Sequence, residues 1–206
     1  MAARTATASV GKSQSQETRQ KILDATALVL SQSGFAGTRL SAIAEHAEIQ
    51  APAIYHYFGS REALIEEAMW TGLAGMNIAM RESLDALPKD TAPLDRLLAA
   101  VDTHLRYMFS TSNFAVAYIR NTGQLPPAMR VRQAEEEAKL ALLWRDLFRA
   151  ADDAGRLRED LDVTMMRMMV VNGLNITSEW WSPRFGTLSE LVATTQAMVR
   201  AAIERR

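Results

Sequence analysis

The sequence predicts an all-α protein of about nine helices. Alanine, leucine, methionine, glutamate and arginine dominate its 206 residues, and no run of alternating β-branched residues is bounded by turns. Glycine, proline, serine and threonine punctuate the chain at helix-length intervals. There is no cysteine, so disulfides, thiolate metal sites and cysteine nucleophiles are excluded. A chain of this length buries about 70% of its unfolded surface and needs no such staple.

The first 87 residues divide into a leader and four helices. Residues 1–15 lack the apolar segment of a secretory signal, and we expect a disordered leader there. Gly34 is expected to end the first helix, with Phe35 folded back on its last turn, and Ser60 suits the cap of the fourth. We predict these helices over residues 17–33, 40–47, 50–58 and 60–87.

The remaining chain is predicted to form five amphipathic helices. Breaks containing proline separate several of them, and Pro126 or Pro127 is tolerated in a first helical turn. Thr187 and Glu190 have the spacing of a capping box, which marks the start of the last helix. We predict these helices over residues 93–109, 113–122, 126–154, 163–181 and 188–204.

Charge gives little indication of a partner. The net charge is −1, and the first 62 residues carry six basic against five acidic side chains, so the strong basicity of many nucleic-acid-binding proteins is missing. The three histidines are far apart, with neither metal-binding spacing nor a neighbouring nucleophile. We therefore expect no catalytic residue, no metal site and no cofactor. The apolar runs are shorter than the roughly 20 residues that a membrane span requires.

Residues 40–58 have the pattern of a helix-turn-helix pair. Two short helices, each with one apolar stripe, are joined by about three residues and follow a longer helix on which both can pack. Ile54 and Phe58 are expected to anchor the second helix in the core, while Tyr55, His56 and Tyr57 lie outside. For Tyr55 the alternative is a packed ring that exposes only its hydroxyl.

The segment "ILDATALVLSQSGFAGTRLSAIAEHAEIQAPAIYHYFGSREALIEEAM" resembles the DNA-binding head of the TetR, or tetracycline-repressor-like, family of bacterial transcriptional regulators. The likeness covers residues 17–69, and the elements "IL.A", "GF..T", "IA" and "IYHYF.S.EAL" occur in the family's order and spacing. It implies a helix-turn-helix DNA-binding domain over residues 16–62 and a helical domain for effector binding and dimerisation over residues 63–206.

The resemblance also implies which residues contact DNA. Gln50 can read adenine, Ala51 and Pro52 can touch thymine methyl groups, and the Tyr55 and Tyr57 hydroxyls can bind phosphates. Residues ahead of the second helix would contact the groove edge, and the arginine that opens the fourth helix would clamp a phosphate. The predicted DNA contacts are Thr38, Arg39, Ser41, Gln50, Ala51, Pro52, Ala53, Tyr55, His56, Tyr57 and Arg61.

Four positions depart from the family's pattern. Glu48 stands in the turn where glycine is common, and Gln50 replaces the usual serine or threonine at the start of the third helix. Ala51 replaces a basic or polar residue, and Pro52 replaces the glycine after it. Because proline fits a first helical turn, we expect the fold to survive. Base specificity would then depend largely on methyl contacts and DNA shape.

In this family the helical body holds a ligand pocket and dimerises through its last two helices, here 163–181 and 188–204. The first of these is apolar on more than one side, as a helix between its own body and a partner would be, although a monomer could also bury it. Eleven methionines suit a bulky apolar guest. The predicted pocket residues are His104, Met108, Tyr118, Arg120, Trp144, Phe148, Met169, Asn172 and Asn175, with Met69, Leu73, Leu105 and Phe114 as further apolar candidates.

We therefore predict a cytoplasmic, nucleoid-associated homodimer without membrane association. It would be a transcriptional repressor that a small apolar or amphipathic effector releases from a palindromic double-stranded DNA operator. The segments "AGRLREDLDV" and "WWSPRFGTLS" are similar to a TetR subgroup that senses fatty-acyl and steroid-derived coenzyme A esters. The alternative is a helical small-molecule-binding protein whose head does not read DNA specifically. A helical-bundle enzyme is disfavoured because paired inward carboxylates or histidine ligands are missing.

Overall fold

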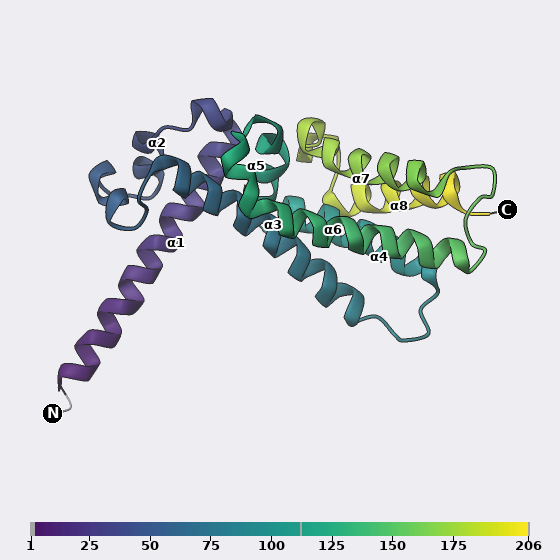
Figure 1. The fold of residues 1–206 in the computed structure, drawn as a ribbon, viewed down its shortest axis with the longest axis horizontal. Coiled ribbons are helices and arrows are strands. Elements are labelled where there is room, and N and C mark those ends of the chain that lie inside the picture. The colour runs from purple at the N-terminus through teal and green to yellow at the C-terminus, as the bar shows by residue number, and fades with distance from the viewer. Residues whose placement is uncertain (1–2, 112, 206) are drawn as a thin grey trace.

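A computed structural model describes residues 3–111 and 113–205, with side chains described from residue 14 onward except at 110–112. The described residues form helices joined by turns and loops, with no strand among them, which confirms the all-α prediction (Figure 1). Its α-helices are α1 (Ala3–Gly37), α2 (Leu40–His46), α3 (Arg61–Asp85), α4 (Pro93–Arg106), α5 (Asn113–Asn121), α6 (Pro127–Asp153), α7 (Val163–Trp180) and α8 (Leu188–Ile203). Its short 3-10 or π segments are η1 (Ala51–His56), η2 (Tyr107–Thr111), η3 (Thr122–Gln124) and η4 (Pro183–Phe185).

Helix α1 is interrupted near its C-terminal end. Gly34 has a φ of 70°, the left-handed conformation that glycine permits, and breaks the helix where its end was predicted. The disordered leader predicted over residues 1–15 falls almost entirely on residues whose side chains the structure does not describe, and it stays a prediction.

The predicted helix over residues 50–58 is mostly the 3-10 segment η1. The Ala53 amide donates to the Gln50 carbonyl and the Tyr57 amide to the Ile54 carbonyl, both at 2.9 Å and both with three-residue spacing. Pro52 lies in the first turn, where a helix makes no use of the amide hydrogen that proline lacks. The segment that follows the turn is shorter and tighter than an ordinary recognition helix.

One hydrophobic cluster, the head cluster, joins the N-terminal elements. Ile22 and Leu30 of α1 pack with Ile43 of α2, Ile54 of η1 and Leu64 of α3, all essentially inaccessible to solvent. Two residues of α5 and one of α6 also belong to this cluster, so the head does not pack by itself. The division of the chain at residue 62 stays a prediction.

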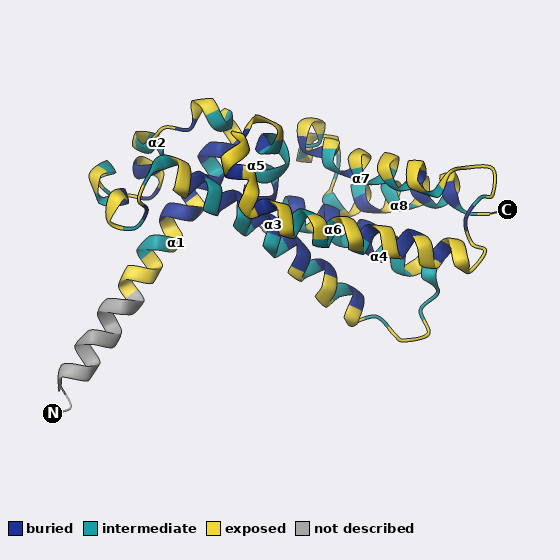
Figure 2. Cartoon of the chain, viewed as in Figure 1, coloured by how far each residue is buried: buried dark blue, intermediate teal, exposed yellow. Residues whose placement is uncertain are grey.

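A second cluster, the body cluster, fills the space between α3, α4, α6, α7 and α8. Leu97 and Val101 of α4 meet Trp144 and Phe148 of α6, and Val199 of α8 closes the far side. Figure 1 shows α6 and α7 running antiparallel to each other, and Figure 2 shows buried residues along the inner sides of these helices and exposed residues along the outer sides. The amphipathic periodicity of the sequence is satisfied in this way.

Two predicted caps are formed. The Ser60 side chain accepts the Ala63 amide at 3.0 Å and starts α3. At the start of α8, the Thr187 hydroxyl accepts the Glu190 amide and the Glu190 carboxylate accepts the Thr187 amide, which is a complete capping box. These hydrogen bonds lower the pKa of Glu190 below its usual value.

Candidate nucleic-acid interface and interior cavity

The helix-turn-helix pair is formed by α2, η1 and the turn between them. Ile43 and Ala44 are buried under the turn, and the Ile49 amide donates to the Ala44 carbonyl at 3.0 Å. Glu48 lies in the turn with a φ of 56°, in the left-handed region that glycine adopts most easily. The position where the family often has glycine therefore keeps the glycine backbone conformation with a glutamate.

Most of the predicted DNA contacts lie on the outside of this pair. Ile54 and Phe58 are buried as predicted, while Tyr55 is 57% exposed, which excludes the packed alternative for its ring. The other predicted contacts on this surface are either exposed or half-buried. The exposed residues are Arg39, Ser41, Gln50, Pro52 and His56, and the half-buried residues are Ala51, Ala53 and Tyr57. These side chains are accessible to a duplex, and their individual roles stay predictions.

Thr38 requires a correction, because its side chain is not available at the surface. The residue is 1% exposed, and its hydroxyl donates to the Gly34 carbonyl at 2.7 Å. The same carbonyl also accepts the Thr38 backbone amide at 3.1 Å, so Thr38 binds it through both its main chain and its side chain. Thr38 therefore fixes the turn between α1 and α2 in place of contacting the groove edge.

Arg61 also differs from the predicted phosphate clamp. Its Nε donates to the Thr38 carbonyl at 2.6 Å, a terminal nitrogen donates to the Phe35 carbonyl, and the guanidinium carbon lies 4.9 Å from the centre of the Phe35 ring. A second terminal nitrogen pairs with Glu62 at 3.1 Å. The guanidinium fork is thus occupied within the protein and holds the α1–α2 turn against the start of α3.

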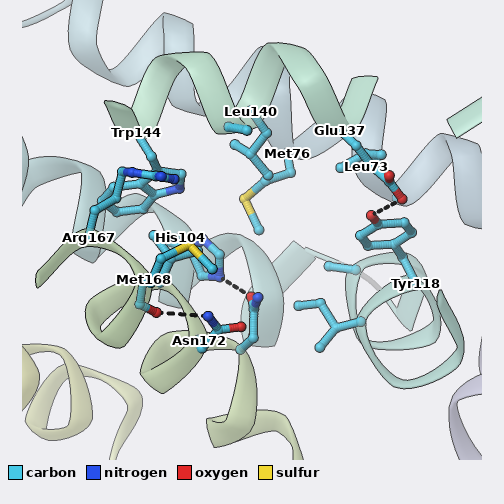
Figure 3. Close-up of a pocket in the computed structure, with 16 residues that line it drawn as sticks. Leu73, Met76, His104, Tyr118, Glu137, Leu140, Trp144, Arg167, Met168 and Asn172 are labelled. Carbon is cyan, nitrogen blue, oxygen red and sulfur yellow. Dashed lines mark hydrogen bonds between the residues drawn. The ribbon is translucent and has the colours of Figure 1, made fainter. Parts of the chain in front are cut away.

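An interior cavity of about 240 Å³ lies between α3, α4, α5, α6 and α7 (Figure 3). Its wall is predominantly apolar. Leu73 and Met76 come from α3, and Leu140 and Trp144 come from α6. The cavity matches the usual composition of a small-molecule site, in which apolar walls surround a few polar groups.

His104 is the most deeply buried polar group of this cavity. It is 1% exposed, and its Nε2 lies 3.0 Å from the Asn175 Oδ1 (Figure 3). Burial lowers its pKa to about 4, against a smaller upward effect of the Asn175 hydrogen bond, so the imidazole is neutral at pH 7. Its ring centre lies 6.0 Å from that of Trp144.

A second polar pair lies in the same cavity. The Tyr118 hydroxyl donates to the Glu137 carboxylate at 2.8 Å (Figure 3). Burial, together with the neighbouring carboxylate, raises the pKa of Tyr118 above its usual value. Tyr118 therefore stays a neutral hydrogen-bond donor at every physiological pH.

The structure brings five of the nine predicted pocket residues together, along with Leu73 from the wider set. They are His104, Tyr118, Trp144, Asn172 and Asn175. Of the other four, Met108 and Phe148 are packed into the body cluster, whereas Arg120 and Met169 line an adjoining groove between α5 and α7 together with Tyr118, Asn172 and Asn175. Of the other apolar candidates, Met69, Leu105 and Phe114 are buried in core and do not line the cavity.

Arg120 joins three helices beside the cavity. From α5 it donates to the Ser31 carbonyl of α1 at 2.9 Å, to the Ser178 carbonyl of α7, and to the Glu179 carboxylate at 3.0 Å. Next to it, Asn121 donates to the Leu30 carbonyl at 3.2 Å. The C-terminal part of α1 is therefore bound to the last residues of α5, and the residues of α5 just before them line the cavity.

Sequence patterns did not reveal two charged residues of the cavity. Glu137 and Arg167 both line it, but each lies in a helix with many other charged or polar residues. Their inward direction depends on how α6 and α7 pack. The spacing of Glu137 and Trp144, seven residues apart on one face of α6, is the signal that could have identified Glu137.

Helices α7 and α8 expose an apolar face away from the body. Met165, Met169, Ile176 and Trp180 follow one another at helical spacing on α7, and Met198 adds to them from α8. An exposed apolar patch of this kind is typical of a protein–protein contact.

Two kinds of site are not found among the described residues. No helix there is long and apolar enough to cross a bilayer, and histidine, aspartate and glutamate form no group of three that could hold a metal.

Two family models match the chain. One, described as "Bacterial regulatory proteins, tetR family", matches residues 22–68, and the other, described as "Tetracyclin repressor-like, C-terminal domain", matches residues 90–203. The first contains the helix-turn-helix pair. The second contains most of the cavity wall and the exposed face of α7 and α8, and it spans more than half of the chain.

Individual relatives agree with these models. The chain is similar to the HTH-type transcriptional repressor KstR2 of Mycobacterium tuberculosis, with 23% identity over 166 residues that cover 80% of this chain and 82% of that protein. The solved structure of KstR2, titled a ketosteroid transcriptional regulator, has a TM-score of 0.77 at 22% identity and covers 91% of this chain and 95% of its own.

A second solved structure is AibR in complex with isovaleryl coenzyme A and operator DNA. Its TM-score is 0.78 at 18% identity, and the match covers 90% of this chain and 97% of that chain. At such identities the structural likeness establishes the fold.

Proposed function

Since the chain belongs to the TetR family of bacterial regulatory proteins, we propose that it is a homodimeric repressor released from a palindromic operator by a small apolar or amphipathic effector. The chain is a DNA-binding transcriptional regulator and not an enzyme. The observation that carries the proposal is the pairing of an exposed helix-turn-helix surface with an apolar cavity in the body behind it.

The head supplies DNA contacts of two kinds. Gln50 and Pro52 are exposed at the start of η1, where they can meet base edges, and Tyr55 and His56 are exposed at its end, where they can meet the backbone. With Ala51 half-buried and Arg61 engaged inside the protein, one head makes few charged contacts. Two heads about 34 Å apart, one turn of B-DNA, would double the contacts and read a palindrome.

The exposed face of α7 and α8 is the surface through which two chains would pair. Its apolar residues form a continuous stripe along α7, and burying this stripe against a second copy removes it from water. The dimer would then act at the chromosome in the cytoplasm.

Helix α5 is the element that would couple the cavity to the head. Ala115, Tyr118 and Ile119 of α5 line the cavity, and Arg120 holds the end of α1. An effector that prefers one position of α5 would favour one position of the head, and the two heads of a dimer would lose the spacing that the operator requires.

The effector is proposed to be apolar or amphipathic, and an acyl- or steroid-type coenzyme A ester is one such class. The apolar wall and the small set of polar groups support an apolar body. KstR2 is a ketosteroid transcriptional regulator, and AibR was solved in complex with isovaleryl coenzyme A, so coenzyme A esters are the first compounds to test.

The proposal is tested by binding of the purified protein to labelled duplexes. We expect tighter binding to DNA from upstream of its own gene than to a random duplex of equal length, decreasing with salt and with added acyl-coenzyme A. The variant Tyr55→Phe removes one exposed hydroxyl and should weaken binding to both duplexes. Equal affinity for the two duplexes over the whole salt range would show that the head does not read a specific operator.

A further inference from the structure

The cavity carries a carboxylate at one end that has no cationic partner. Glu137 is half-buried, and both side-chain hydrogen bonds that it accepts in the described chain come from neutral hydroxyls, Tyr118 at 2.8 Å and Thr122 at 3.5 Å, on the same oxygen. A partly buried carboxylate is stabilised by further donors. A ligand that reaches this end therefore gains most from a group that donates a hydrogen bond.

The other end of the cavity carries donors that have no acceptor. Arg167 is half-buried, and its side chain makes no hydrogen bond or ion pair with residues 14–109 and 113–205, whose side chains the structure describes. Trp144, which lies beside it in Figure 3, has a buried indole nitrogen without a partner. Leaving such a donor unpaired costs about 1–3 kcal/mol. Arg167 also borders a surface groove between α6 and α7, which places it where the cavity meets solvent.

The two ends are separated by an apolar stretch of defined length. Glu137 and Trp144 are seven residues apart on α6, which corresponds to about 10 Å along the helix axis at about 1.5 Å per residue. Leu73, Met76 and Leu140 lie between them (Figure 3). A fully extended polypeptide advances about 3.5 Å per residue, or about 1.2 Å for each of its three backbone bonds. An extended alkyl chain of about eight carbons therefore spans this distance.

We propose that the effector has an apolar body with a negatively charged group at the Arg167 and Trp144 end and a hydroxyl group at the Glu137 and Tyr118 end. This deepens the proposed function and rests on it only in taking the cavity as the effector site. A hydroxyl is preferred over an ammonium because the apolar wall would leave a buried ammonium poorly solvated. A free carboxylate and the phosphates of a coenzyme A ester, whose thioester group itself is neutral, are two sources of the negative charge.

The test is calorimetric titration of the full chain, without DNA, with ω-hydroxyoctanoate, octanoate and octanol. We expect ω-hydroxyoctanoate to bind at least about ten-fold more tightly than either of the others, because a hydrogen bond to a charged group contributes about 1.5–3 kcal/mol. Equal affinities for the three probes, or tighter binding of ω-aminooctanoate than of the hydroxy acid, would overturn the proposal.

Two cavity variants assign the ends of the ligand. Glu137→Gln should weaken ω-hydroxyoctanoate about ten-fold and leave octanoate unchanged, whereas Arg167→Gln should weaken both acids and leave octanol unchanged. The matched controls Glu82→Gln and Arg81→Gln, both exposed on α3 outside the cavity, should change nothing. Thermal unfolding checks that each variant is folded. A uniform loss of affinity for all three probes in either cavity variant contradicts the assignment.

Failure of this inference is distinguishable from failure of the proposed function. If the protein prefers the hydroxy acid but its affinity for DNA is unchanged when the acid is bound, the result contradicts effector release and leaves the two-ended ligand supported. A chain that octanol releases from DNA as readily as ω-hydroxyoctanoate does would contradict the two-ended ligand alone. The coenzyme A ester of ω-hydroxyoctanoate, titrated in parallel, identifies the source of the negative charge: the free acid binds more tightly if its carboxylate is the source, and the ester binds more tightly if the coenzyme phosphates are.

Discussion

At the scale of single residues, Glu48 has a left-handed backbone conformation that a residue with a side chain rarely adopts. Its φ of 56° destabilises a non-glycine residue by about 1–2 kcal/mol. Glycine would remove this strain, but its greater backbone freedom in the unfolded chain offsets part of the gain in stability. We expect Glu48→Gly to raise the free energy of unfolding by about 0.5–1 kcal/mol, measured by urea denaturation. Glu45→Gly, in the regular helix α2, is the control and should lower it by about as much. Destabilisation by both variants would remove the strain argument.

His104 predicts a specific acid sensitivity. The folded-state pKa of about 4 lies below the ordinary value of 6.5, so the unfolded chain binds the proton more readily. Burial of the neutral imidazole therefore contributes stability that is fully present above pH 6.5 and is lost as the pH falls towards 4. The loss in the free energy of unfolding is about 3 kcal/mol, at about 1.4 kcal/mol for each unit of pKa difference.

We expect this loss to be absent from His104→Gln, in urea denaturation at a series of pH values. His46→Gln, exposed on α2, is the matched control and should keep the wild-type pH dependence. If wild type and His104→Gln lose stability in parallel between these pH values, the imidazole does not reside in a desolvated site.

At the scale of elements, the crossing of α3 and α5 depends on Gly72. A methyl group at this position would lie 2.3 Å from the Phe114 carbonyl oxygen, which is backbone and cannot turn aside. Gly72→Ala should therefore push α5 away from α3 and lower stability by about 1–3 kcal/mol. Gly75→Ala, one turn further, meets only the Tyr107 hydroxyl of a side chain that can move, and should be milder.

Thermal unfolding of the two alanine variants compares the sites directly. Because α5 also lines the cavity and holds the end of α1, Gly72→Ala should in addition change the effect of effector on DNA binding. A melting temperature of Gly72→Ala equal to that of Gly75→Ala would mean that α3 and α5 are not in the close contact described.

At the scale of the whole molecule, assembly depends on the exposed face of α7 and α8. Met169→Glu places a charge at the centre of this face, where a dimer would have to bury it. We expect sedimentation velocity to show a shift from dimer to monomer, together with a loss of operator binding. Val131→Glu changes a residue of almost equal exposure, 75% against 76%, on α6 and should remain dimeric. Dimers of both variants would exclude this face as the interface.

Local sequence patterns determined the helices and the head. Apolar periodicity, the cap at Ser60 and the capping box at Thr187 depend on neighbours within one turn, so the sequence alone located them. The buried positions of Ile54 and Phe58 followed from the same periodicity. The 3-10 form of η1 was missed because the form of a short helix depends on how its turns are completed.

Tertiary packing alone decided which side chains were free to act. Thr38 and Arg61 have the chemistry of DNA contacts, but both donate to backbone carbonyls of the α1–α2 turn inside the protein, and no sequence spacing displays this. Met108 and Met169 have the same composition signal, yet one is core and the other is surface. The charges of Glu137 and Arg167 enter the cavity only because α6 and α7 pack with those faces inward, since a helix fixes the direction of a side chain relative to its own axis and not relative to its neighbours.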